Sequence, residues 1–152
     1  MNKYFIATLL SVFFSNAFAK DVYLLTHSDS AKSSIINELD KLVGPINTET
    51  AEPALVSQSN FDLFVIESSD YIENLDSLTK NTLQGAEAIL ISGQPKNNSD
   101  VAKYLIGYGV EAEYLLIKGL ESGQNPELVY FNNDKKNPLH TVAHSIVKKA
   151  IK

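Results

Sequence analysis

Cysteine and arginine are both absent from this chain, and each absence excludes a class of site. Without cysteine the protein forms no disulfide bond, carries no catalytic thiol and offers no thiolate ligand to a metal. Without arginine it lacks the bidentate guanidinium that binds carboxylates and phosphates. The formal net charge is −5, and nucleic-acid affinity comes from basic clusters, so nucleic acid is excluded as a partner.

The chain also lacks the common nucleotide-binding and nucleophile motifs. Gly107-Tyr108-Gly109 ends a predicted helix instead of joining a strand to a helix, so it is not a dinucleotide fingerprint. No Gly-Lys-Ser phosphate loop occurs, and no Gly-x-Ser-x-Gly elbow surrounds Ser68 or Ser69. We therefore expect no cofactor and no assembled catalytic set.

Long apolar runs are missing beyond the first residues, which have the pattern of a signal peptide. Lys3 supplies a positive charge, residues 4–14 are apolar, and Ala17-Phe18-Ala19 fits the small-x-small cleavage rule. A membrane anchor is the competing interpretation, but the run is shorter than the roughly 20 residues that a spanning helix needs. We expect cleavage after residue 19, a single domain over 20–152 with no membrane span, and a periplasmic location.

What the sequence does contain is an alternation of strand and helix patterns. Residues 22–25 are a short apolar run, residues 26–30 a polar turn, and apolar residues then recur at helical spacing up to Val43, before Gly44 and Pro45. Further strands are predicted at 46–50, 61–66, 88–91, 114–117 and 128–131, and further helices at 71–83, 99–106 and 138–151.

This alternation predicts an α/β fold, namely a three-layer sandwich with right-handed crossovers. A mostly parallel, flavodoxin-like, five-stranded sheet of order 2-1-3-4-5 fits best. The link between the last two strands lacks a helical pattern, so we expect an antiparallel edge hairpin near the C-terminus.

Ligands of such sheets bind beyond the carboxyl ends of the strands, and three polar turns are predicted to lie there. The candidate ligand-binding residues are Thr26, His27, Ser28, Asp29, Ser30, Glu67, Ser68, Ser69, Asp70, Ser92, Gly93 and Gln94. His27 could act as a base or ligand, and the helix after it could hold an anion. The alternative is that these residues only cap helices, and Asp29 itself would occupy the positive helix end.

His140 and His144 are four residues apart on the last predicted helix and could reach one metal ion. The zincin pattern needs Glu after the first histidine, and Thr141 stands there instead. Two ligands make a weak site, so we interpret them as histidines on an exposed helix shoulder and expect no metal.

Three hypotheses on function remain, and one of them is a purely structural accessory subunit, which predicts a flat apolar patch and no pocket. The leading one is an exported, non-enzymatic domain that binds an envelope protein partner or a small-molecule ligand, as part of a sensor, transporter or envelope assembly. The alternative is a small periplasmic hydrolase or ligand-processing enzyme that uses His27 with Glu67, Ser68 or Asp70.

Overall fold

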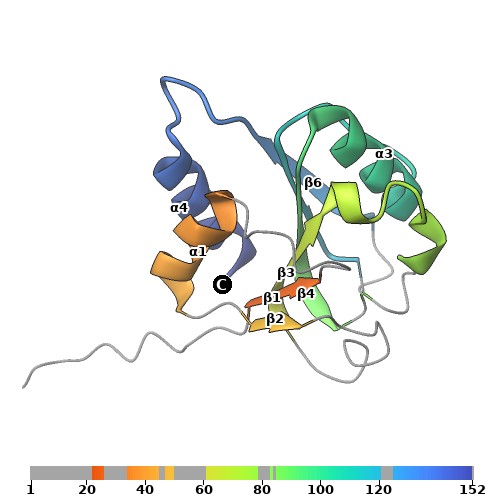
Figure 1. Cartoon of the computed structure of the whole chain (residues 1–152), viewed down its shortest axis with the longest axis horizontal. Helices are drawn as coiled ribbons and strands as arrows, with labels where there is room; N and C mark the ends of the chain where they lie inside the picture. The colour runs from red at the N-terminus through yellow and green to blue at the C-terminus, as the bar shows by residue number, and fades with distance from the viewer. Residues whose placement is uncertain are drawn as a thin grey trace, which may run out of the picture.

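The computed structural model describes residues 22–25, 34–44, 47–49, 61–78, 83, 85–120 and 125–151, with a six-stranded sheet between helices (Figure 1). The strands are β1 (Val22–Leu25), β2 (Asn47–Glu49), β3 (Phe61–Glu67), β4 (Ala86–Ser92), β5 (Tyr114–Lys118) and β6 (Glu127–Phe131). The helices are α1 (Ser34–Val43), α3 (Pro95–Ile106) and α4 (Leu139–Ala150), with two 3-10 turns, η2 (Ser68–Asp70) and η3 (Leu75–Ser77).

The sheet has the order β2-β1-β3-β4-β5-β6 and is mixed. The β1–β2, β1–β3 and β3–β4 pairs are parallel, whereas β4–β5 and β5–β6 are antiparallel. The prediction of a five-stranded, mostly parallel, flavodoxin-like sheet is therefore wrong, because the sheet has a sixth strand and β5 is reversed. The antiparallel β5–β6 pair does occupy the place of the edge hairpin that the sequence predicts.

The reversal of β5 has a local cause in the segment 107–113. Tyr114 begins β5 opposite Ser92, the last residue of β4, so the chain must travel back along α3 before it re-enters the sheet. Gly107 ends α3 in the left-handed region (φ 84°), and a Cβ on Gly109 would collide with the carbonyl oxygen of Ser99. The helix pattern after β4 predicts a crossover to a parallel strand. It does not predict that segment 107–113 packs back against α3 and leads into an antiparallel strand.

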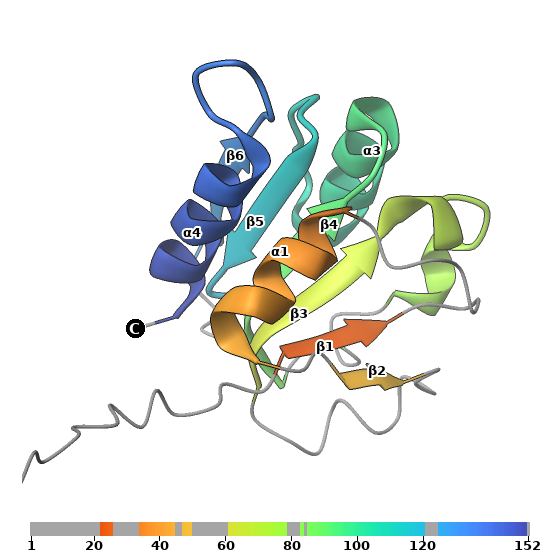
Figure 2. The same ribbon diagram turned by 60° about the vertical axis from the view of Figure 1, so that its left-hand side comes forward.

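Two apolar cores lie on opposite faces of the sheet (Figure 2). Strand residues alternate between the faces, so neighbours along β3 and β4 enter different cores. One core packs α3 on the sheet and includes Phe64, Ile66, Ile89, Ile91, Val101, Leu105, Leu115 and Ile117. The other packs α1 and α4, which lie side by side, and includes Ile35, Leu39, Leu63, Val65, Leu90, Leu116, Val142 and Ile146.

The predicted helix over 71–83 is also corrected by the structure. Its first part forms the single 3-10 turn η3 after η2, because Asn74 has a non-helical conformation (φ −143°, ψ 62°) that interrupts any continuous helix. Ser77 Oγ donates a hydrogen bond to the Asn74 carbonyl at 2.7 Å and stabilises that turn. Residues 79–82 lie outside the described part of the chain.

Helix α3 begins earlier than the sequence suggested. Pro95 is its first residue and Gln94 its N-cap, so Ser99 and Asp100 are interior helical residues and not caps. Proline suits this first position because its missing N–H would have no partner there. Among the described residues, no helix combines the length and the apolar character needed to cross a bilayer.

Candidate functional site

The carboxyl ends of β3 and β4 come together with the start of β5. Glu67 lies beside Ser92, and Ser92 lies beside Tyr114, so their side chains form one row across three strands. Residues 26–30, which include His27, lie outside the described residues. The pairing of β1 with β3 does put Leu25 beside Ile66, as the prediction of neighbouring strand ends required.

The remaining candidate residues differ greatly in exposure. Ser68 is completely buried and Ser92 is 3% exposed, whereas Ser69 and Gln94 are exposed. The structure therefore brings Ser68 and Ser92 to the same sheet edge but does not present Ser68 to solvent. A serine nucleophile must be reached by its substrate, so this burial argues against a catalytic Ser68.

Gly93 explains why Ser68 is inaccessible. A Cβ on Gly93 would collide with Ser68 Oγ and would lie 3.3 Å from Asn98 Oδ1. Neither of these two buried oxygen atoms has a hydrogen-bond partner in the described structure. The three residues pack so closely that no substrate-sized space exists between them.

Asn98 is a structural residue that the sequence analysis did not single out. Its Nδ2 donates to the carbonyl oxygens of Gly93, Ala112 and Glu113 at 3.2, 2.9 and 2.8 Å. The side chain is fully buried in α3 and joins the end of β4 to the start of β5. Asn98 comes just before the helix that the sequence predicts over 99–106, so nothing in the sequence pattern distinguished it.

Tyr114 closes the row of polar residues on the α1 side. Burial raises the pKa of its hydroxyl, and the negative charges of Glu113 and Glu67 raise this pKa further by smaller amounts. A hydrogen bond with Ser34 lowers the pKa and offsets part of the increase. The phenol is therefore neutral at physiological pH and serves as a hydrogen-bonding group.

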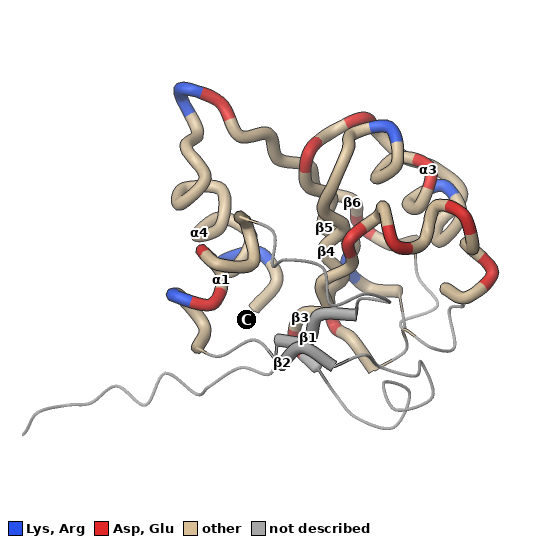
Figure 3. The backbone as a smooth tube through the Cα atoms, viewed as in Figure 1, with Lys and Arg blue, Asp and Glu red and all other residues tan. Residues whose placement is uncertain are grey.

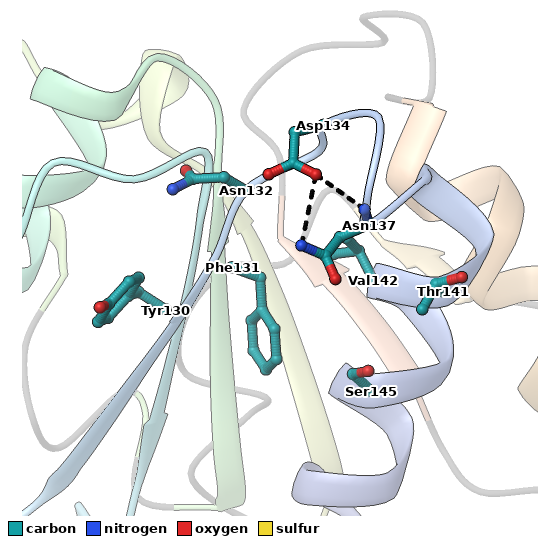
Figure 4. A pocket seen from close by; sticks show the side chains of 8 residues that line it. All are labelled: Tyr130, Phe131, Asn132, Asp134, Asn137, Thr141, Val142 and Ser145. Carbon is teal, nitrogen blue, oxygen red and sulfur yellow. Dashed lines mark hydrogen bonds between the residues drawn. The ribbon is translucent and has the colours of Figure 1, made fainter.

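A separate pocket of about 300 Å³ lies between the end of β6 and the first turns of α4 (Figure 4). Its lining consists of Tyr130, Phe131, Asn132, Asp134, Asn137, Thr141, Val142 and Ser145. The Phe131 ring points toward α4, whereas the Tyr130 ring points away on the other side of the strand (Figure 4). Val142 is buried beneath this pocket, and most of the polar residues form its exposed rim.

The loop at the mouth of this pocket is held by Asp134. Its Oδ1 accepts hydrogen bonds from the backbone N–H groups of Lys136 and Asn137 at 2.7 and 2.8 Å, and the Asn137 carbonyl accepts one from Asp134 N–H. The two backbone N–H groups that donate to its carboxylate lower the pKa of Asp134, so this exposed group is ionised at neutral pH. Figure 3 shows the acidic and basic positions side by side at the tip of this loop.

Several polar groups of the pocket keep unused hydrogen-bonding capacity in the described structure. Asp134 Oδ2 has no hydrogen bond, while the Asn137 side chain uses only its Nδ2, toward Asp134 at 3.4 Å. Asn132 accepts from Glu113 N–H through its Oδ1 at 3.0 Å, which leaves its Nδ2 free. The hydroxyl groups of Thr141 and Ser145 also line the pocket. Both donors and acceptors are thus available to a ligand.

The two helical histidines lie on the same helix as this pocket but do not line it. His140 and His144 are both exposed, as the interpretation of an exposed helix shoulder predicts. Within the described residues, no group of three or more His, Asp or Glu side chains is placed to hold a metal ion.

The pocket lies where the sequence predicts no site, because ligands of such a sheet are expected only beyond the carboxyl ends of parallel strands. Two antiparallel reversals make β6 run in the same direction as β4, so Phe131 also ends at this sheet edge. The signal was present in Asn132-Asn133-Asp134, a polar turn that follows a strand and precedes a helix, like the turns at 67–70 and 92–94.

Comparisons with protein-family models, with curated proteins and with solved structures found no match for this chain.

Proposed function

We propose that this protein is an exported, non-enzymatic domain that binds a small molecule in the pocket between β6 and α4. The observation that carries the proposal is a concave site of about 300 Å³ that combines an aromatic wall with several polar side chains, which keep hydrogen-bonding capacity among the described residues. Small-molecule sites combine apolar walls with polar groups that fix the orientation of the ligand, and this pocket has both.

The chemistry of the pocket favours binding over catalysis. A general base works best when its pKa lies near the operating pH, but the pKa of Asp134 is shifted downward, away from that range. The described residues that line the pocket beside Thr141 and Ser145 include no histidine or lysine that could take a hydroxyl proton. The alternative of a hydrolase built on Ser68 is disfavoured by the complete burial of that side chain.

The periplasmic location is part of this proposal and rests on the sequence of residues 1–19. An intact-mass measurement on protein recovered from the periplasmic fraction of an expressing bacterium tests it. The expected mass is that of a chain beginning at Lys20, and a chain that stays in the cytoplasm with its first residues attached would contradict export.

Thermal unfolding of the mature domain against metals, sugars, amino acids and organic anions tests the binding function. A ligand at 100 times its dissociation constant stabilises by about 2.7 kcal/mol, which raises the midpoint by several degrees in a domain of this size. The pocket-filling variant Ser145→Phe is compared with His144→Phe, since His144 is the exposed neighbour outside the pocket.

We expect at least one compound to stabilise the wild type and His144→Phe but not Ser145→Phe. If no compound stabilises the wild type, or if Ser145→Phe retains the full shift, the pocket is not the ligand site. The first of these results would direct the search to partner proteins of the envelope.

A further inference from the structure

We propose that the ligand of this pocket is an uncharged, polyhydroxylated molecule of monosaccharide size. This inference rests on the proposed binding function and specifies the chemical class of the ligand. Four features of the pocket carry it, namely its unused donors and acceptors, its charge, its apolar wall and its volume.

The unused polar groups match the hydroxyl groups of a sugar. A hydroxyl both donates and accepts, and the pocket offers acceptors in Asp134 Oδ2 and the side-chain Oδ1 of Asn137, a donor in Asn132 Nδ2, and two groups that do both in Thr141 and Ser145. A ligand with only acceptors would leave Asp134 unsatisfied, and a ligand with only donors would leave Asn132 unsatisfied. A molecule that carries several hydroxyl groups can satisfy both.

The charge of the pocket disfavours anions. Among the described residues that line the pocket, Asp134 is the one ionised residue, and none is a lysine, arginine or histidine. Lys135 and Lys136 follow Asp134 in the loop, but neither side chain lines the pocket. An anionic ligand would face the Asp134 carboxylate without a compensating cation, whereas a neutral hydroxyl can donate a charge-assisted hydrogen bond to it. An ammonium group could pair with Asp134 but would oppose the N–H donors of Asn132.

The apolar surface and the volume agree with a single sugar ring. The Phe131 ring and the buried Val142 provide the wall against which the C–H groups of a pyranose can pack (Figure 4). With a share of about 30 Å³ per water molecule in the liquid, the pocket volume corresponds to about ten water molecules, which leaves room for one monosaccharide.

The test is a set of titrations of the ¹⁵N-labelled mature domain, followed by NMR, with ligands that share a ring and differ in charge. The neutral probes are D-glucose, D-galactose and D-mannose, the anions are D-glucuronate and D-galacturonate, and the cation is D-glucosamine. We expect at least one neutral sugar to shift the amide signals of Asn132, Asp134, Asn137 and Thr141, and to bind at least tenfold more tightly than its uronate.

Variants check that the polar rim makes the contacts. Asp134→Asn and Thr141→Val are expected to weaken binding of that neutral sugar at least tenfold, because each removes a group that the ligand would use. His140→Ala, an exposed change outside the lining on the same helix, is expected to leave the affinity unchanged.

The outcomes separate this inference from the proposed function. Tighter binding of a uronate or of glucosamine at these residues overturns the neutral-polyol inference while a small-molecule site remains. Failure of all the sugars to shift these signals also overturns it, and the amino acids and organic anions of the thermal panel then decide whether the pocket binds anything. If those compounds fail as well, the proposed function fails with it.

Discussion

Replacing Asn98 by alanine should destabilise the fold through the junction of β4, α3 and β5. The side chain is fully buried, and its Nδ2 donates to the carbonyl oxygens of Gly93, Ala112 and Glu113. The substitution leaves these three acceptors without that donor at the point where the chain returns to the sheet.

The magnitude follows from the contacts that are lost. Each hydrogen bond contributes a net of about 0.5–1.5 kcal/mol, and the two hydrogens of Nδ2 are shared among three acceptors, so the side chain contributes roughly 1–3 kcal/mol. The better helix propensity of alanine offsets up to roughly 0.7 kcal/mol of this loss. Removal of the buried Asn98 Oδ1, which has no partner in the described structure, offsets a further part. We expect Asn98→Ala to lower the free energy of unfolding by roughly 1–2 kcal/mol.

Urea unfolding of the mature domain measures this change, and Asn97→Ala is the matched control. Asn97 is the preceding residue of α3, is half-buried and makes none of these hydrogen bonds, so its substitution should change stability by no more than about 0.5 kcal/mol. Asn98→Asp should cost more than Asn98→Ala, because it places a carboxylate against the carbonyl oxygens. An Asn98→Ala cost no larger than that of Asn97→Ala would refute the structural role of this side chain.

Three further predictions concern the same sheet edge and the pocket loop. Gly93→Ala should destabilise the fold by roughly 2–4 kcal/mol, because alanine is strained at φ +137° and its Cβ would collide with Ser68 Oγ. In a Ser68→Ala background only the backbone strain of about 1–2 kcal/mol should remain, and a double-mutant cycle in urea measures the difference. The pKa of Asp134 should lie below the ordinary aspartate value in an NMR titration, so its stabilising effect is present at neutral pH and is lost as the pH falls through the lowered pKa; an unshifted value would contradict the hydrogen bonds of the loop. Tyr71 and Tyr114 should ionise only above the usual tyrosine range in an alkaline absorbance titration, because burial raises both pKa values. The stability that the two neutral phenols contribute should be lost as the pH rises toward those raised pKa values.

The sequence was sufficient to place most strands and helices because their signals are local. The apolar stripe of α4 and the apolar run of β3 both depend on spacing within one segment, and both elements lie within a few residues of their predicted bounds. The neighbouring positions of β1 and β3 followed from the order of such segments.

The direction of β5 could not be read in this way because it depends on contacts between distant residues. Gly109 must pass against Ser99, and Asn98 must reach Ala112 and Glu113, before the chain re-enters the sheet antiparallel to β4. A helix between two strands usually indicates a parallel crossover, and nothing in the spacing of apolar residues marks the return segment.

The candidate site was predicted only in part for a similar reason. Expecting ligands beyond the ends of parallel strands identified Glu67 and Ser92, which do meet at one edge. The pocket instead depends on how α4 packs beside α1 and on the direction of β6, and both are consequences of the tertiary fold. A polar turn such as 132–137 acquires a role in binding only once those elements leave a concave space beside it.

The most direct test of the account is to map where a stabilising compound binds, by following the backbone amide signals of the mature domain during its titration. We expect the largest changes in amide signals at Asn132, Asp134, Asn137 and Thr141, around the pocket between β6 and α4. Signal changes centred on Glu67, Ser92 and Gly93, with the pocket signals unchanged, would contradict binding in this pocket. They would instead place the ligand site at the carboxyl ends of the parallel strands.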